Sequence, residues 1–135
     1  MARRKPAPPK LPEPSEDQIH FAVVSHLRTR AREDVVFWHT PNQGIRTKAG
    51  AAKLKAMGLT PGVPDLVIYA EGQLYALELK TTKGRLSRAQ DDMLKALRHA
   101  GAHAVAAFGL DSALQYLTAW GIFASKPPAA LRAVA

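Results

Sequence analysis

The chain has no cysteine among its 135 residues, which excludes disulfides and thiolate-bound zinc and fits a cytoplasmic protein. It also lacks any apolar run of about 18 residues, the minimum for a membrane-spanning helix. Its N-terminus has no apolar segment typical of a secretory signal. Phosphate-binding GxxxxGK[ST] loops, GxSxG elbows and HExxH helices are missing too, so nothing supports ATP use, serine hydrolysis or a zinc-protease site.

Basic residues outnumber acidic ones by 19 to 11, and the formal net charge of +8 indicates a polyanionic partner. Much of this charge lies at the ends of the chain. Four bases fall within residues 1–14 and two within residues 125–135, so thirteen bases and ten acids remain between them, or about +3. The basic ends are consistent with contacts to a polyanion and equally with a role in solubility alone.

Five prolines exclude a helix or a central strand from residues 1–14, so we expect a flexible arm there. Residues 15–124 are long enough for one domain with a hydrophobic core, and residues 125–135 are expected to be a tail. Ser15 and Gln18 form a capping-box pattern, and the apolar recurrence that follows predicts a helix to about residue 32.

The remaining periodicities predict an α/β fold with a mixed sheet flanked by helices, in the order α-β-α-β-β-α-β-α. After the first helix, the expected elements are a strand at 35–38, a helix at 49–57, strands at 65–70 and 74–80, a helix at 87–99, a strand at 103–108 and a helix at 112–120. Turn residues at 41–44 separate the first strand from the second helix.

Three charged residues lie at matching ends of the two central strands. Asp65 opens the first of these strands, and Glu78 and Lys80 lie near the end of the second. Because side chains alternate along a strand, Glu78 and Lys80 project to the same face. A hairpin centred on Gly72 sets Asp65 opposite Glu78 or Lys80, so we expect two carboxylates and an ammonium to converge at one edge of the sheet.

Such an edge suits the hydrolysis of phosphodiesters. Carboxylate oxygens bind hard cations such as Mg²⁺ or Mn²⁺, which activate water and neutralise charge on the phosphate. An ammonium nearby can position the attacking water or stabilise the same charge. A Glu-x-Lys pair on a strand is by itself more often a solvent-facing pair, so it is the joint occurrence with Asp65 that favours the catalytic interpretation.

The ordered set of motifs resembles the PD-(D/E)xK nuclease superfamily and, more narrowly, its VRR-NUC family. The resemblance covers about residues 15 to 122, and His20 departs from it because the family pattern has a glutamine there. The segments that carry it are Gly-Val-Pro-Asp at 62–65, Glu-Leu-Lys at 78–80, Leu-Ser at 86–87 with Gln90, Pro-Asn-Gln-Gly-Ile-Arg at 41–46, Lys-Leu-Lys-Ala-Met-Gly at 53–58 and Ser-Glu-Asp-Gln-Ile at 15–19.

The resemblance implies a restriction-endonuclease-like core and divalent-metal-dependent cleavage of DNA. By position, Asp65 and Glu78 are expected to ligate Mg²⁺ or Mn²⁺ together with the backbone carbonyl of Leu79, and Lys80 is the expected catalytic lysine. Stand-alone family members resemble structure-selective nucleases, so the expected substrate is branched DNA such as a Holliday junction or a flap. The expected assembly is a homodimer.

Two further residues have both a structural and a catalytic interpretation. Glu16 stabilises a helix N-terminus simply as an acid in its first turn, whereas the resemblance implies that it binds the metal directly or through water. Gln90 completes a capping box with Ser87, whereas the resemblance implies that it assists catalysis. None of the five histidines has the spacing of metal ligands, and we expect a structural role for His39 at its strand end.

Two basic runs without acids flank the expected metal edge and are candidates for contacts to DNA phosphates, although such runs are often solvated faces. Asn42 in the turn has two interpretations as well, contact with DNA or stabilisation of the turn. The bases are Arg46, Lys48, Lys53 and Lys55 in the first run and Lys83, Arg85 and Arg88 in the second.

The sequence therefore predicts a metal-dependent DNA endonuclease. One alternative is a DNA-binding module on the same fold whose nuclease centre is unused. Another is a small structural or assembly protein whose basic ends bind a partner.

Overall fold

The structure, a computed structural model, describes residues 3–41 and 47–124 of the chain and confirms the expected α/β class and order of elements. Its helices and strands are α1 (Glu16–Arg30), β1 (Val36–His39), α2 (Lys48–Ala56), β2 (Leu66–Ala70), β3 (Gln73–Lys80), α3 (Arg88–His99), β4 (His103–Phe108) and α4 (Leu110–Ala119).

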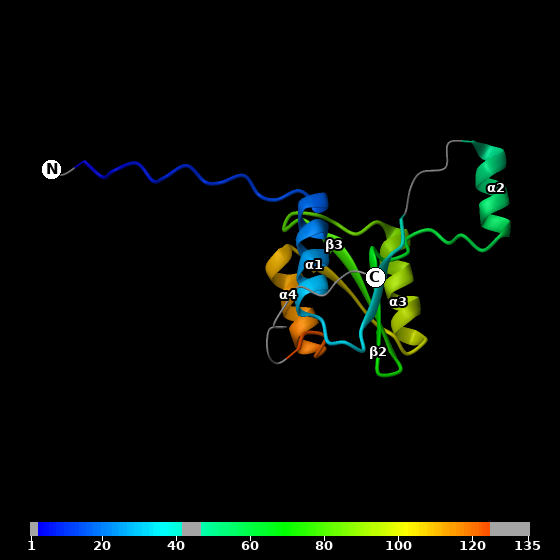
Figure 1. The fold of residues 1–135 in the computed structure, drawn as a ribbon. Helices are drawn as coiled ribbons and strands as arrows, with labels where there is room; N and C mark the ends of the chain where they lie inside the picture. Colours follow the sequence, from blue (N-terminus) through cyan, green and yellow to red (C-terminus); the bar gives the residue numbers. More distant parts are fainter. Residues whose placement is uncertain (1–2, 42–46, 125–135) are drawn as a thin grey trace.

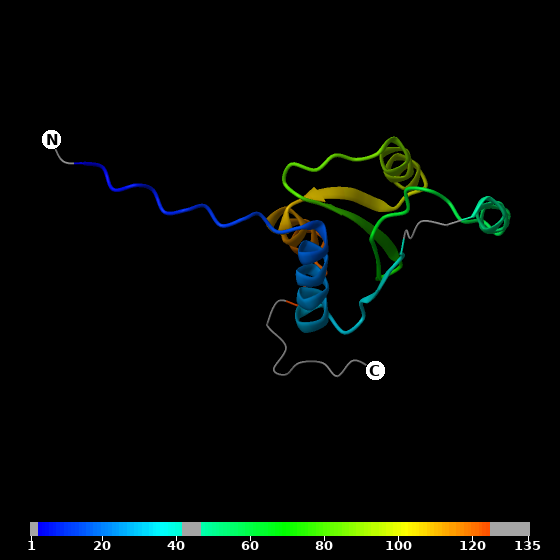
Figure 2. The same ribbon diagram turned by 90° about the horizontal axis from the view of Figure 1, so that it is seen from above.

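A four-stranded mixed sheet in the order β1-β2-β3-β4 forms the middle layer. The pairs β1/β2 and β2/β3 are antiparallel, and β3/β4 is parallel. Helices α1 and α4 cover one face of the sheet and α3 covers the other, as Figures 1 and 2 show. A polar group at the end of a central strand is therefore enclosed by helices on both sides.

Each face of the sheet has its own hydrophobic core. On the α1 and α4 side, Leu77 and Leu79 of β3 pack with Ile19, Val23 and Leu27 of α1. On the α3 side the core is small and consists of Ala76, Leu94 and Ala104, with half-buried leucines around them. Because β3 contributes side chains to both cores, its alternating positions at 78 and 80 face the thin core beneath α3.

The hairpin between β2 and β3 turns on two residues, Glu71 and Gly72, with φ of 51° and 74°. Positive φ at both central residues is the geometry of a tight type I′ turn. The turn is thus centred between these residues and not on Gly72, and Leu66 pairs with Leu77. Continuing this register by one residue sets Asp65 opposite Glu78, which selects one of the two pairings expected from the sequence.

Some predicted boundaries shift by one or two residues. Helix α1 ends at Arg30, because the chain turns there and Ala31 forms an isolated bridge with Phe123. Helix α4 begins at Leu110, two residues earlier than predicted, because Gly109 with φ of 94° serves as its N-cap. The predicted turn at 41–44 lies largely outside the described residues.

Helix α2 stands apart from the three-layered body in Figures 1 and 2 and has no buried residue. It ends at Ala56, one residue before the predicted end, because Met57 is the C-cap residue and Gly58 with φ of 99° follows it. No helix among the described residues is long and apolar enough to cross a membrane.

The turn before Asp65 packs directly on the first turn of α3. Gly62 has φ of 80°, and a β-carbon at this position would lie 2.3 Å from the backbone oxygen of Ala89 and 2.7 Å from the backbone nitrogen of Gln90. Only glycine permits this approach, so Gly62 sets the spacing between Asp65 and α3.

We predict that Gly62→Ala lowers the free energy of unfolding by about 3 kcal/mol or more, because backbone strain adds to a clash with backbone atoms. Gly72→Ala is the matched control, since Gly72 has a similar φ of 74° but nothing within 4 Å of the added carbon. It should cost only about 1 kcal/mol. Urea unfolding followed by circular dichroism measures both, and equal losses would contradict the packing role of Gly62.

Candidate active site

Asp65 lies at the start of β2, between the Gly62 turn and the strand. Its Oδ2 accepts a hydrogen bond of 2.8 Å from the backbone N–H of Leu79 on β3. Its backbone oxygen accepts from the N–H of Thr40 at 3.2 Å and from Nδ1 of His39 at 2.7 Å. Both the carboxylate and the backbone of Asp65 are thus fixed by neighbouring strands.

Glu78 is the most deeply buried charged residue of the described chain, with 2% of its surface exposed. Its Oε1 accepts a hydrogen bond of 2.9 Å from Nε2 of Gln90 on α3 and lies 3.8 Å from Nζ of Lys80. Its Oε2 is buried and has no hydrogen-bond partner within the described residues. A buried carboxylate oxygen without a partner is costly, because desolvation is not compensated.

Burial and, second, the negative charge of Asp65 raise the pKa of Glu78 to about 8, against the opposing effect of Lys80. Two carboxylates that share a partly dry site cannot both be ionised easily. In the absence of a cation, the pair of carboxylates therefore keeps a proton to a higher pH than an isolated glutamate would.

Lys80 is 9% exposed, and its Nζ lies 3.8 Å from Glu16 Oε1 as well as from Glu78. The ammonium thus bridges the start of α1 and the end of β3. Glu16 lies in the first turn of α1, as its helix-end interpretation expects, and the same carboxylate contacts Lys80.

Gln90 likewise makes two contacts, one within its own helix and one with Glu78. Its Oε1 accepts from the backbone N–H of Ser87 at 2.9 Å, which completes the predicted capping box, and its Nε2 donates to Glu78. The capping bond fixes the orientation of the amide, so the nitrogen points at the carboxylate.

These residues fit a hard divalent cation. The unpartnered Oε2 of Glu78 and the carboxylate of Asp65 supply oxygen ligands of the kind that Mg²⁺ and Mn²⁺ prefer. A cation between them would remove the repulsion that raises the pKa of Glu78, and no protein group among the described residues does this fully.

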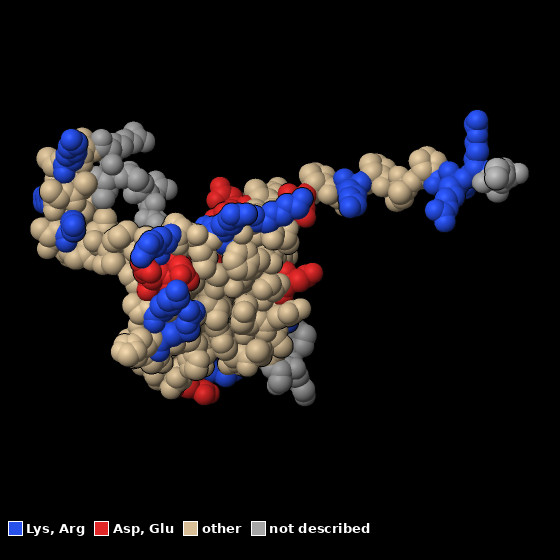
Figure 3. Space-filling view, turned by 180° about the vertical axis from the view of Figure 1, so that it is seen from behind, with Lys and Arg blue, Asp and Glu red and all other residues tan. Residues whose placement is uncertain are grey.

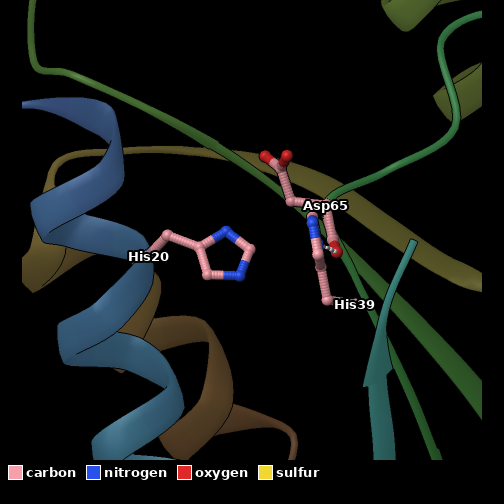
Figure 4. A group of neighbouring side chains, drawn as sticks. All are labelled: His20, His39 and Asp65. Atoms are coloured by element: carbon pink, nitrogen blue, oxygen red, sulfur yellow. Dashed lines mark hydrogen bonds between the residues drawn. The ribbon is translucent and has the colours of Figure 1, made fainter. Parts of the chain in front are cut away.

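A second cluster, which was not predicted from the sequence, consists of His20, His39 and Asp65 (Figure 4). One ligand atom from each of these residues lies within 4.8 Å of the others. The rings of His20 and His39 meet edge to face with centroids 4.5 Å apart. Burial and the neighbouring His39 lower the pKa of His20, against smaller opposing effects of Asp65 and Asp17. The one usable signal was that His20 follows Glu16 by four residues, which puts both on one face of α1.

The predicted DNA-contacting bases fall into two groups. The first group, Lys48, Lys53 and Lys55, is exposed on α2, which lies apart from the carboxylates, and Asn42 and Arg46 lie outside the described residues. The second group is exposed on the segment from β3 into α3 and consists of Lys83, Arg85 and Arg88. Figure 3 shows lysines and arginines over α2, along one upper edge of the body and on the N-terminal arm.

Comparisons with known proteins agree with one another. The family model described as VRR-NUC domain matches residues 15–109. Among solved structures, one titled "VRR_NUC domain protein" superposes with a TM-score of 0.64 and 23% identity, covering 79% of this chain and 88% of its own. Another, titled "VRR_NUC domain", gives a TM-score of 0.53 and 12% identity, covering 76% and 94%. At such identities, the two structures support the fold alone. No curated protein matches the sequence significantly.

The raised pKa of Glu78 implies that the stability of the metal-free protein depends on pH. Because the folded state holds this proton more tightly than the unfolded state, the stabilisation is complete below pH 4.5 and is lost as the pH rises to about 8. We predict that Glu78→Gln removes this slope and stabilises the protein above pH 8 by about 1–3 kcal/mol.

Urea unfolding in EDTA at pH 5.5 and 8.5 measures the effect. Glu71→Gln is the matched control, because Glu71 is exposed in the hairpin turn, and it should keep the slope of the wild type. Parallel pH profiles for wild type and Glu78→Gln would contradict the prediction.

Proposed function

This chain belongs to the VRR-NUC domain family, which is nuclease-related, and we propose that it is a divalent-metal-dependent endonuclease that cleaves branched DNA. The observation that carries the proposal is the buried Oε2 of Glu78, which has no hydrogen-bond partner within the described residues. The same carboxylate interacts electrostatically with Asp65, and its other oxygen, Oε1, lies 3.8 Å from the Lys80 ammonium. A purely structural carboxylate would be expected to have its oxygens paired.

In the proposed centre, Asp65, Glu78 and the backbone carbonyl of Leu79 hold Mg²⁺ or Mn²⁺. The cation would supply Lewis-acid stabilisation of negative charge on the phosphate and would make water a stronger nucleophile. The hydrogen bond from Leu79 N–H to Asp65 fixes one carboxylate across the hairpin. The Gln90 amide fixes the other, so both are preorganised before a cation arrives.

Lys80 is the proposed catalytic lysine. Its ammonium is anchored between Glu16 and Glu78 at 3.8 Å from each, which directs it to the same place as the carboxylates. There it can donate to the attacking water or to a phosphate oxygen whose charge grows in the transition state. Glu16, half exposed, is the proposed outer group that orients Lys80 and contacts the cation through water.

Phosphate contacts are the proposed role of the exposed bases. The segment with Lys83, Arg85 and Arg88 leads from the site residue Lys80 to the site residue Gln90, so DNA bound over it would bring a phosphodiester to the carboxylates. The bases of α2, together with Asn42 and Arg46, are proposed to extend this contact, with α2 reaching along the DNA.

The alternative function is a DNA-binding module whose nuclease centre is unused. It shares the fold and the basic residues but requires no ionisable cluster. The presence of Asp65, Glu78, Lys80 and Gln90 in one hydrogen-bonded and ion-paired group favours the enzyme.

We predict that the protein cuts DNA with Mg²⁺ or Mn²⁺ and loses this activity in EDTA. Asp65→Asn and Lys80→Met should each lower the rate at least about 100-fold, because each removes an interaction that acts on the developing charge. Asp111→Asn is the matched control, since Asp111 is exposed in the first turn of α4 and should leave the rate unchanged.

A panel of labelled duplex, single-stranded, flap and four-way-junction DNA measures both the rate and the preference. Faster cutting of the branched substrates is expected. Cleavage that survives EDTA or Asp65→Asn would contradict the proposed centre, and binding without cleavage under either metal would favour the alternative function.

For DNA binding, we predict that Lys83→Gln and Arg85→Gln each weaken affinity about 3- to 10-fold and each reduce the salt dependence by about one counterion. The control is Lys95→Gln, because Lys95 is ion-paired to Asp91 at 2.8 Å farther along α3. Fluorescence anisotropy across a range of salt concentrations, on an Asp65→Asn background, measures this. An unchanged salt slope would place the DNA elsewhere.

A homodimer is proposed as the active assembly. The reason is size, since a domain of a 135-residue chain has little surface for two arms of a junction, and family resemblance points the same way. Light scattering at working concentration should give a dimer mass, and a monomer mass both with and without DNA would refute the proposal.

A further inference from the structure

Two histidines from separate elements, both earlier in the chain than Asp65, approach this residue, whereas Glu78 comes later in the chain. His20 comes from the second turn of α1, and His39 ends β1. Ligand atoms of the three residues lie within 4.8 Å of one another, and Figure 4 shows both rings directed toward Asp65. In a formed metal site such atoms are roughly 3 Å apart, so small side-chain rotations would complete the cluster.

The hydrogen bonding of His39 determines which of its nitrogens is free. Nδ1 lies 2.7 Å from the backbone oxygen of Asp65, and a carbonyl oxygen only accepts, so Nδ1 carries the proton. In the neutral ring, the lone pair is therefore on Nε2. Histidines that ligate metals are commonly oriented by such a bond from the other ring nitrogen to a backbone carbonyl.

The ring of His20 is available as well. Within the described residues it makes an edge-to-face contact with His39 and no side-chain hydrogen bond that would occupy its nitrogens. It lies four residues after Glu16 on α1, so the same helix face carries groups toward Lys80 and toward Asp65.

We propose that His20, His39 and Asp65 form a second metal site, which takes a borderline transition-metal dication such as Zn²⁺. Two imidazole nitrogens and one carboxylate are a typical ligand set for such ions, whereas Mg²⁺ prefers oxygen throughout. The chain thus carries an oxygen set and a histidine set that share Asp65. This inference concerns binding and does not depend on the proposed cleavage activity.

The test is isothermal titration calorimetry, in which ZnCl₂ is added to the metal-free full chain in the absence of DNA. One Zn²⁺ per chain is expected at this site, and His20→Gln and His39→Gln should each weaken its binding at least about tenfold. His99→Gln is the matched control, because His99 is exposed at the end of α3 and should change nothing. Glu78→Gln should change the affinity by less than about threefold.

A second measurement guards against variants that fold poorly. In ¹⁵N spectra of the wild-type histidine rings, Zn²⁺ should shift the nitrogens of His20 and His39 and leave those of His99 in place. Wild-type affinity in both histidine variants, or shifts confined to other histidines, would overturn the site. A loss in Glu78→Gln as large as that in His20→Gln would overturn it too, because Zn²⁺ would then occupy the oxygen set.

Discussion

The proposed active site depends on the close approach of two carboxylates, Asp65 and the almost fully buried Glu78. One oxygen of Glu78 has no partner among the described residues, and the pKa of this group is raised to about 8. Such crowding costs free energy in the absence of a cation, and it is tolerated only because the surrounding structure holds both groups in place. A hard dication would turn the same repulsion into coordination, which is why we interpret the arrangement as a metal centre.

The rest of the fold serves this approach. The two-residue turn at Glu71 and Gly72 sets the register that brings Asp65 opposite Glu78. Gly62 allows the preceding turn to touch the backbone of α3, and α3 then presents Gln90 to Glu78 through its own capping box. Helix α1 contributes Glu16 from the opposite side. Four local features therefore meet at one point: the hairpin turn, the turn at Gly62, the capping box of α3 and the first turn of α1.

That locality explains how much could be predicted. Capping boxes and apolar periodicity predict the helices and strands of the described residues in their observed order, and the expected hairpin brings Asp65 and Glu78 together with Lys80. What the sequence could not supply is tertiary. The burial of Glu78 and Lys80 arises from the packing of α3, whereas a Glu-x-Lys pair on a strand ordinarily faces solvent. The proximity of His20 and His39, which are 19 residues apart in sequence, depends on how α1 lies across the sheet, and no spacing rule contains it.

The two proposed ligand sets that meet at Asp65 differ in chemistry. The position of a bound ion therefore shows directly whether Asp65 and Glu78 form a metal centre. Crystals of the protein grown with Mn²⁺ would show the ion by anomalous scattering. We expect a peak within about 2.3 Å of one oxygen of Asp65 and of Glu78 Oε2, which has no partner within the described residues, with the Lys80 ammonium beside it. A peak bound only by the histidines, or no peak with Glu78 still buried and unpartnered, would contradict it.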